Sequence, residues 1–149
     1  MSNSKEMLIM GIDPGTVACG WAVGGLDGIP TATGSIVSST TVDTNLRIFK
    51  VADDLAEVAS QWRVSFVYCE SPMVFVGVKA ALALGGLSAV INYTIWKKTG
   101  LQVNYLKPTE IRKLLHVPKI DKLKGVKLKK GDIKQNSIAW IRELMDDLQ

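Results

Sequence analysis

The chain is poor in the residues that build disulfide frameworks and cysteine–histidine metal sites. It has two cysteines, Cys19 and Cys69, which are far apart and form no C-x-x-C pair. Their apolar surroundings favour two buried thiols in a reducing compartment. The single histidine, His116, stands shortly before Pro118, where a structural role is the simpler interpretation. The N-terminus is polar and lacks an apolar run, so we expect no secretory signal and a cytoplasmic protein.

Charge is absent from one long stretch, residues 80–96. This stretch is shorter than the ~20 residues that span a membrane, and it contains Ser88, Asn92 and Thr94. A helix that is apolar on all sides is typical of a helix buried on two faces. The sequence therefore predicts a core helix and no membrane span.

Acidic residues are scarce in the second half of the chain and basic residues in the first. The 149 residues carry a net charge of +4, but residues 1–75 have a balance of −4 and residues 76–149 one of +8. With 47% hydrophobic and 21% charged residues, the chain is expected to form a single globular domain over 1–149. An acidic half beside a basic half suggests metal chemistry next to a polyanion-binding surface, although a lysine-rich loop is often only a solvated loop.

The order of predicted elements indicates an α/β fold. Strands are expected at residues 8–12, 20–24, 31–38, 64–69 and 101–106, and helices at 45–63, 78–98, 110–116 and 132–148, with a basic loop at 117–130. The stripe of the first helix is expected to include Leu46, Phe49 and Leu55, with Asp43 or Thr44 as N-cap, and Gly100 is expected to end the second helix. This order predicts a mixed five-stranded sheet flanked by helices, with strands one, four and five parallel.

The stretch IMGIDPGT at residues 9–16 places a carboxylate where an apolar strand meets a forced turn. Pro14 cannot donate to a ladder and Gly15 tolerates a positive φ, so the chain is expected to bend directly after Asp13. A carboxylate buried there requires a metal ion, a cation or backbone donors. The alternative is an aspartate that only orders the turn.

Two further carboxylates are candidates to join Asp13. Glu70 follows the fourth strand, and Asp132 opens the last helix. If strands one and four are parallel neighbours, their carboxyl ends meet at the same edge, and three carboxylates there need a compensating cation. Mg²⁺ prefers oxygen ligands, and two such ions can clamp a phosphodiester during in-line displacement.

These motifs together resemble the RuvC family of Holliday junction resolvases, within the RNase H-like nuclease superfamily. The resemblance rests on residues 11–16 (GIDPGT), Gly20-Trp21, Glu70, residues 81–85 (ALALG), residues 103–113 and the helix from Asp132. It covers nearly the whole chain, and the shortness and divergence of the sequence resemble phage-type members. It implies an RNase H-like fold and a structure-selective endonuclease that makes paired nicks in four-way DNA.

The resemblance also implies a metal site for Mg²⁺, with Mn²⁺ as a substitute, held by Asp13, Glu70 and Asp132. The family has a further aspartate one turn after Asp132, where this chain has Gln135 or Asn136. An amide oxygen at Asn136 brings no negative charge, so a second metal would be held more weakly. Either the enzyme works with three carboxylates, or Asn136 leaves a branched-DNA binding protein with impaired cleavage.

The remaining implied residues would contact DNA. Arg112 stands near the family's catalytic or phosphate-stabilising lysine, with Lys113 as competitor, and Phe75 is the candidate to stack at the junction centre. The lysines implied to contact the DNA backbone are Lys107, Lys113, Lys119, Lys122, Lys124, Lys127, Lys129 and Lys130.

The resemblance also implies that the partner of this chain is a second copy of itself. Such resolvases act as homodimers, and the small residues Ala83, Gly85, Gly86 and Ala89 would let two copies of the helix at 80–96 approach closely.

An alternative function is that of a sugar-kinase-like or actin-like nucleotide-binding protein, which uses a similar GID-x-GT turn. Such proteins require two domains of this kind, which 149 residues cannot supply.

Overall fold

The computed structural model describes residues 7–72 and 77–114. Its elements are β1 (Ile9–Asp13), β2 (Ala18–Gly24), β3 (Pro30–Val37), α1 (Thr44–Gln61), β4 (Phe66–Glu70), α2 (Val78–Thr99), β5 (Val103–Leu106) and α3 (Pro108–Leu114). The chain divides into two compact units, Met1–Pro108 and Thr109–Gln149, and each is described by itself. The single domain expected over 1–149 stays a prediction, and the expected helix at 132–148 and loop at 117–130 lie outside the described residues.

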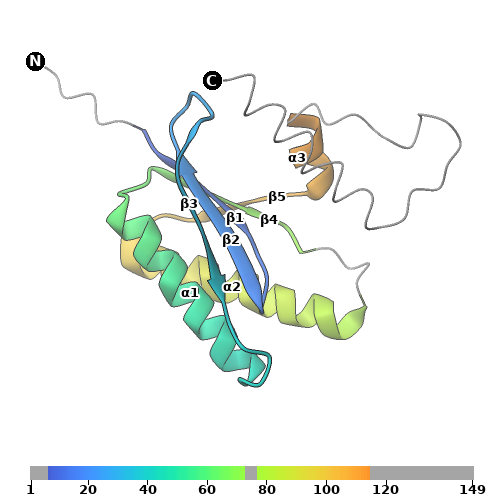
Figure 1. The fold of residues 1–149 in the computed structure, drawn as a ribbon. Coiled ribbons are helices and arrows are strands. Elements are labelled where there is room, and N and C mark those ends of the chain that lie inside the picture. The colour runs from blue at the N-terminus through green and yellow to red at the C-terminus, as the bar shows by residue number, and fades with distance from the viewer. Residues whose placement is uncertain (1–6, 73–76, 115–149) are drawn as a thin grey trace, which may run out of the picture. The chain divides into compact units, whose positions relative to one another are not determined.

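The first unit is built on one five-stranded sheet with the order β3-β2-β1-β4-β5 (Figure 1). β1 pairs antiparallel with β2 and parallel with β4, β2 pairs antiparallel with β3, and β4 pairs parallel with β5. The prediction of an α/β fold with a mixed five-stranded sheet is therefore confirmed. The predicted strand limits differ from the observed ones by one or two residues, in either direction.

Both long helices pack on the same face of the sheet (Figure 1). Alternate residues of the central strands, among them Met10, Val23 and Val67, are fully buried against them. The opposite face carries the other residues of each strand, and neither α1 nor α2 covers it. The sheet thus has one face committed to the core and one face left for other contacts.

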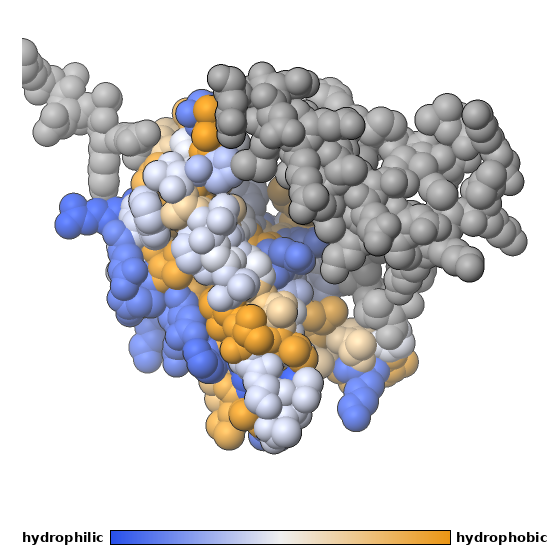
Figure 2. All heavy atoms as spheres, in the orientation of Figure 1, coloured by the Kyte–Doolittle hydropathy of each residue, from blue (hydrophilic) through white to orange (hydrophobic). Residues whose placement is uncertain are grey.

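The apolar stripe of α1 differs from the expected one. The buried side chains are Ile48, Val51, Ala52, Leu55, Ala56 and Ala59, whereas Leu46 is 59% and Phe49 52% exposed. The two candidate stripes are about one residue apart on the helix, so periodicity alone does not choose between them near the first turn. Asp43 caps α1 as expected by accepting hydrogen bonds from the amides of Asn45 and Leu46. Figure 2 shows hydrophilic residues gathered over α1, at the left of the view.

The helix α2 is buried on one face, not on two as expected. Its buried residues are Leu87, Ser88, Ile91 and Ile95, which pack toward α1 and the sheet. By length and composition it could cross a membrane, with a mean hydropathy of 1.4, but one such helix is weak evidence for a span. It ends at Gly100, whose left-handed φ of 78° confirms the predicted stop.

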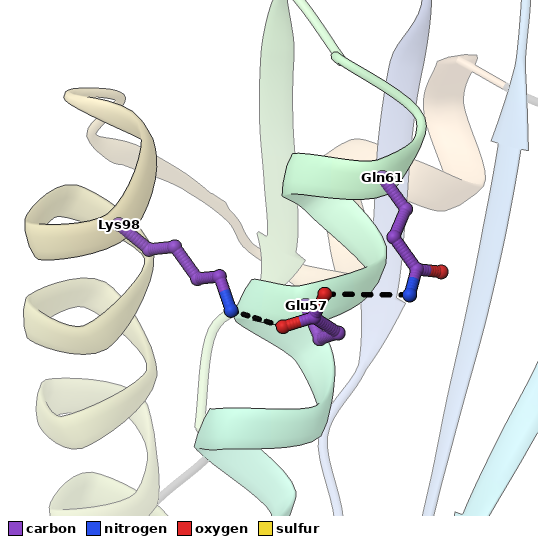
Figure 3. A network of polar contacts seen from close by, with 3 residues as sticks. All are labelled: Glu57, Gln61 and Lys98. Atoms are coloured by element: carbon purple, nitrogen blue, oxygen red, sulfur yellow. Dashed lines mark hydrogen bonds and ion pairs between the residues drawn. The ribbon is translucent and has the colours of Figure 1, made fainter.

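Polar contacts hold the last turns of the two helices together (Figure 3). The carboxylate of Glu57 in α1 accepts a hydrogen bond from the ammonium of Lys98 in α2, and a second from Gln61 at 3.3 Å. The hydrogen bond and the charge of Lys98 lower the pKa of Glu57. On the other side of α2, the Tyr105 hydroxyl of β5 donates to the carbonyl oxygen of Ser88 at 2.6 Å.

Packing between β2 and β3 predicts which glycine the fold cannot lose. A Cβ at Gly34 would lie 2.5 Å from the ring of Trp21, whereas a Cβ at Gly11 would meet nothing within 4 Å. We expect Gly34→Ala to lower the free energy of unfolding by about 1–3 kcal/mol, because the indole must shift within a packed face. Gly11→Ala, the matched control, should be neutral or slightly stabilising. Urea denaturation of both variants measures the difference, and equal stabilities would contradict this account.

Candidate active site

The carboxyl ends of β1, β4 and β5 meet at one edge of the sheet. The pairing Ile12↔Cys69 makes Asp13 and Glu70 the next residues on neighbouring parallel strands, and Glu70 pairs with Leu106 of β5. β3 is parallel to β1 and ends at the same edge, so both α1 and α2 begin there. In open α/β sheets this edge is where ligands bind.

A tight turn places Asp13 at this edge. A Cβ at Gly15 would overlap the carbonyl oxygen of Ala18, so the chain can close the turn only with glycine there. The expected reason, a positive φ, is wrong, since the positive-φ glycines of the described ranges are Gly28, Gly77 and Gly100. The side chain of Asp13 is exposed rather than buried, which corrects the expectation of a buried carboxylate.

The residue opposite Asp13 on β2 is Gly20. A Cβ at Gly20 would lie 3.7 Å from the Cβ of Asp13, which is ordinary van der Waals contact. A larger side chain at this position would extend beside the carboxylate and restrict it. The glycine therefore leaves Asp13 room to reach a ligand.

Glu70 is half-buried at the end of β4 and shares a face with Asp13. Paired residues of neighbouring strands point to the same side of a sheet, and their backbones lie about 4.8 Å apart. Carboxylates on such neighbouring backbone positions can hold one cation between them. Within residues 7–72 and 77–114 no group of three metal-ligating side chains occurs. Asp13 and Glu70 are therefore two ligands of a site that would need further ligands.

Small residues beside the pair leave the strands accessible on this face. Gly11 of β1 and Gly20 and Ala22 of β2 alternate with the buried residues and so share the face of Asp13. A Cβ at Gly11 would meet open space. Sequence reasoning missed this row of small residues, although the spacing of Gly11, Asp13 and Gly20 indicates that the two glycines share a face with the carboxylate. A bulky polymer backbone can approach the carboxylates across it.

Two free thiols lie beneath the pair, on the core face of the sheet. Cys19 and Cys69 are at most 1% exposed, as the sequence predicts. Burial raises the pKa of the Cys19 thiol. Burial, with smaller contributions from Cys19, Asp13 and Glu70, raises the pKa of Cys69 to about 12. Both groups stay neutral near pH 7 and serve as small apolar side chains.

Of the other predicted site residues, Lys107 lies at the same edge as this pair, and the rest cannot be placed beside it. Lys107 directly follows β5 and is exposed at the same edge. Arg112 and Lys113 lie on α3, which begins at Pro108 rather than at residue 110, and their side chains are not described. The predicted site residues that lie outside the described ranges are Phe75, Asp132, Asn136, Lys119, Lys122, Lys124, Lys127, Lys129 and Lys130. Their roles stay predictions.

Comparison with known sequences identifies one matching family. The family described as "Crossover junction endodeoxyribonuclease RuvC" matches residues 9–122. A curated relative of that name from Synechocystis sp. is 28% identical over 103 residues, which make up 65% of this chain and 60% of the relative. The match thus spans less than two thirds of the relative's length.

Comparison with solved structures gives the same fold. Thermus thermophilus RuvC in complex with a Holliday junction substrate superposes with a TM-score of 0.67 at 18% identity, over 74% of this chain and 71% of that one. A second Thermus thermophilus RuvC structure gives a TM-score of 0.65 at 19% identity, over 83% and 86% of the two chains. The expected RNase H-like fold is confirmed.

The buried thiols predict slow chemical modification of the native protein. Iodoacetamide at pH 8 should leave Cys19 and Cys69 unmodified and should alkylate both in denaturant, because only the exposed thiolate reacts. The raised pKa also means that the folded state retains a proton that the unfolded state loses above 9.0, so stability contributed by Cys69 should fall between pH 9.0 and about 12. Mass spectrometry and alkaline denaturation measure the two effects, and rapid native alkylation would contradict the placement of the thiols.

Proposed function

Because the chain belongs to the RuvC family of crossover junction endodeoxyribonucleases, we propose that it is a structure-selective endonuclease that resolves four-way DNA junctions by paired nicks. The observation that carries the proposal is the pairing of Asp13 and Glu70 at the carboxyl ends of β1 and β4, on the face that α1 and α2 leave open. The Thermus thermophilus relative was solved with such a junction, which supports the same substrate here.

The donor set fits a divalent cation of the Mg²⁺ type. Asp13 and Glu70 offer only carboxylate oxygens, and the exposure of Asp13 leaves space for the water ligands that Mg²⁺ retains. We propose that these two residues, with Asp132 and the amide of Asn136, hold the metal, and that Mn²⁺ can replace Mg²⁺. When bound, such an ion neutralises the scissile phosphate and lowers the pKa of water.

Basic and aromatic residues would bind and orient the DNA. Lys107 stands at the same edge as the carboxylates. With the lysines of 113–130 it would neutralise backbone phosphates, which gives affinity without sequence information. Arg112 would stabilise the charge that develops on the phosphate during cleavage, and Phe75 would stack on an unpaired base at the junction centre. We propose that the protein acts in the cytoplasm of a bacterial or phage-infected cell, where its DNA substrate would lie.

The exposed face of α2 supports a homodimer. Along it lie Val78 and Leu82, then Gly85 and Ala89, then Tyr93 and Trp96, all exposed. Large apolar side chains at both ends and small ones in the middle would let two antiparallel copies cross closely. A two-fold dimer would present two Asp13–Glu70 pairs, one to each of the two strands that must be nicked.

The nuclease proposal predicts metal-dependent, junction-selective cleavage. With a synthetic four-way junction and Mg²⁺, we expect symmetric nicks, and with a matched linear duplex or without Mg²⁺, none. Asp13→Asn and Glu70→Gln should each reduce cleavage by at least about 100-fold, because each removes a charge from the metal site, while junction binding persists. Asn136→Asp should raise the cleavage rate by strengthening the second metal position. Gel assays of cleavage and of binding separate these effects.

The outcomes distinguish the nuclease from a protein that only binds junctions. Cleavage by the unchanged chain supports a working resolvase with three carboxylates. Cleavage that occurs only in the Asn136→Asp variant would show that the unchanged chain binds without cutting. Equal affinity for the junction and the linear duplex would refute the proposed substrate.

The dimer proposal predicts a substitution that stabilises the monomer and separates the copies. A side chain at Gly85 would meet nothing within 4 Å in one copy of the chain. Gly85→Leu should therefore keep the fold and improve helix propensity by up to about 1 kcal/mol, yet hold two α2 helices apart. Analytical ultracentrifugation should show a dimer for the unchanged chain and a monomer for Gly85→Leu, with an equal or higher Tm. A dimer that survives the leucine would place the interface elsewhere.

A further inference from the structure

A hollow of about 470 Å³ lies between the first turns of α1 and α2. Thr44 and Arg47 of α1 line one side, Val78, Lys79 and Ala83 of α2 line the other, and Thr16 from the turn after β1 completes it. All these residues belong to the first unit. The hollow is separate from the pair Asp13 and Glu70, neither of which lines it.

The charged side chains that line the hollow are both positive. Arg47 comes from α1 and Lys79 from α2, so the tertiary fold brings the two cations together. The nearest carboxylate along α1 is Asp43, which already accepts hydrogen bonds from the amides of Asn45 at 2.9 Å and Leu46 at 3.4 Å. Two cations in one hollow, with no carboxylate among the described residues that line it, favour an anionic ligand.

The guanidinium of Arg47 is held in place and has a donor left over. One terminal nitrogen donates to the Thr44 hydroxyl at 2.8 Å. Its Nε is buried and makes no hydrogen bond among the described residues. A buried donor without a partner costs free energy, so native structures nearly always supply one. The guanidinium therefore has hydrogen-bonding capacity that the described residues do not use.

The start of α2 adds backbone donors to the same hollow. Gly77 caps the helix without a side-chain hydrogen bond, and the first amide that donates within the helix is that of Ala81, to the Gly77 carbonyl at 2.9 Å. The amides of Val78, Lys79 and Ala80 therefore have no partner in the helix, and all three residues line the hollow. Amides at a helix start that have no partner within the helix favour phosphate.

We propose that this hollow binds a backbone phosphate of the DNA strand that is cut, a few nucleotides from the scissile phosphate. The inference rests on the proposed nuclease function. Thr16 stands three residues after Asp13. The Cα atoms of these two residues can be at most about 11 Å apart, and one strand advances about 3.4 Å per nucleotide along the duplex axis. Arg47 and Lys79 would thus fix the register in which the strand crosses the carboxylates.

Single neutral phosphates test this contact. Each phosphate around the cut site, in a four-way junction and in a linear duplex, is replaced in turn by an uncharged methylphosphonate, and affinity is measured without divalent metal. For the unchanged chain we expect a loss of about 10-fold to 100-fold at one position, the size of a lost charged hydrogen bond. Arg47→Met and Lys79→Met should bind the all-phosphate DNA more weakly and show no further loss at that position. Arg63→Met, which changes an exposed arginine beyond the far end of α1, is the matched control and should keep the profile of the unchanged chain.

The results separate this inference from the nuclease proposal. If Arg47→Met and Lys79→Met keep the position-dependent loss of the unchanged chain, the hollow does not hold a DNA phosphate. Lys79 is exposed, so its variant remains informative even if Arg47→Met unfolds. Inorganic phosphate that binds through Arg47 while the DNA profiles stay unchanged would overturn the DNA assignment in favour of a free anion. If affinity for junction and duplex is equal but the Arg47-dependent position persists on both, the junction proposal fails and the phosphate contact stands.

Discussion

The parallel ladder between β1 and β4 is the constraint on which the site depends. Its register, with Ile12 opposite Cys69, sets Asp13 beside Glu70 and sends both carboxylates to the face away from α1 and α2. A slip of one residue would turn one of the two side chains into the core. The buried residues Val67 and Cys69 oppose such a slip of β4, because it would turn both of them out of the core. Core packing therefore fixes the geometry of two groups that take no part in the core.

The same connectivity gathers cations at the edge that carries the carboxylates. Both helices begin where β1 and β4 end, so their first turns and the turn after Asp13 form one rim. Along this rim the negative pair Asp13 and Glu70 is followed by the positive pair Arg47 and Lys79. α1 is capped by its own Asp43, whereas Gly77 offers α2 no side-chain cap, so the first-turn amides without a side-chain cap are those beside Lys79. Topology alone brings these groups to the same edge of the sheet.

Sequence reasoning located the features that depend on local chemistry and missed those that depend on packing partners. The cap at Asp43, the stop at Gly100 and the carboxylates at the ends of β1 and β4 follow from short-range rules, and the structure has all of them. The exposure of Leu46 and Phe49 did not follow, because two stripes of α1 were apolar and only the sheet decides between them. The hollow at Arg47 was invisible for the same reason, since its second cation, Lys79, comes from another helix.

Electrostatics links the carboxylates of Asp13 and Glu70 to the cations of Arg47 and Lys79. Asp13 and Glu70 repel a phosphate backbone unless a cation lies between them, so the carboxylates alone cannot attract DNA. The proposed phosphate contact at Arg47 and Lys79 would offset that repulsion before a metal binds and would leave the two carboxylates free for the ion. Phosphate contacts position a strand without reading its sequence, which suits an enzyme that selects a branched shape. With the proposed phosphate contact, the acidic balance of residues 1–75 is compatible with DNA binding, because Arg47 and Lys79, which line one hollow, would both face the DNA backbone.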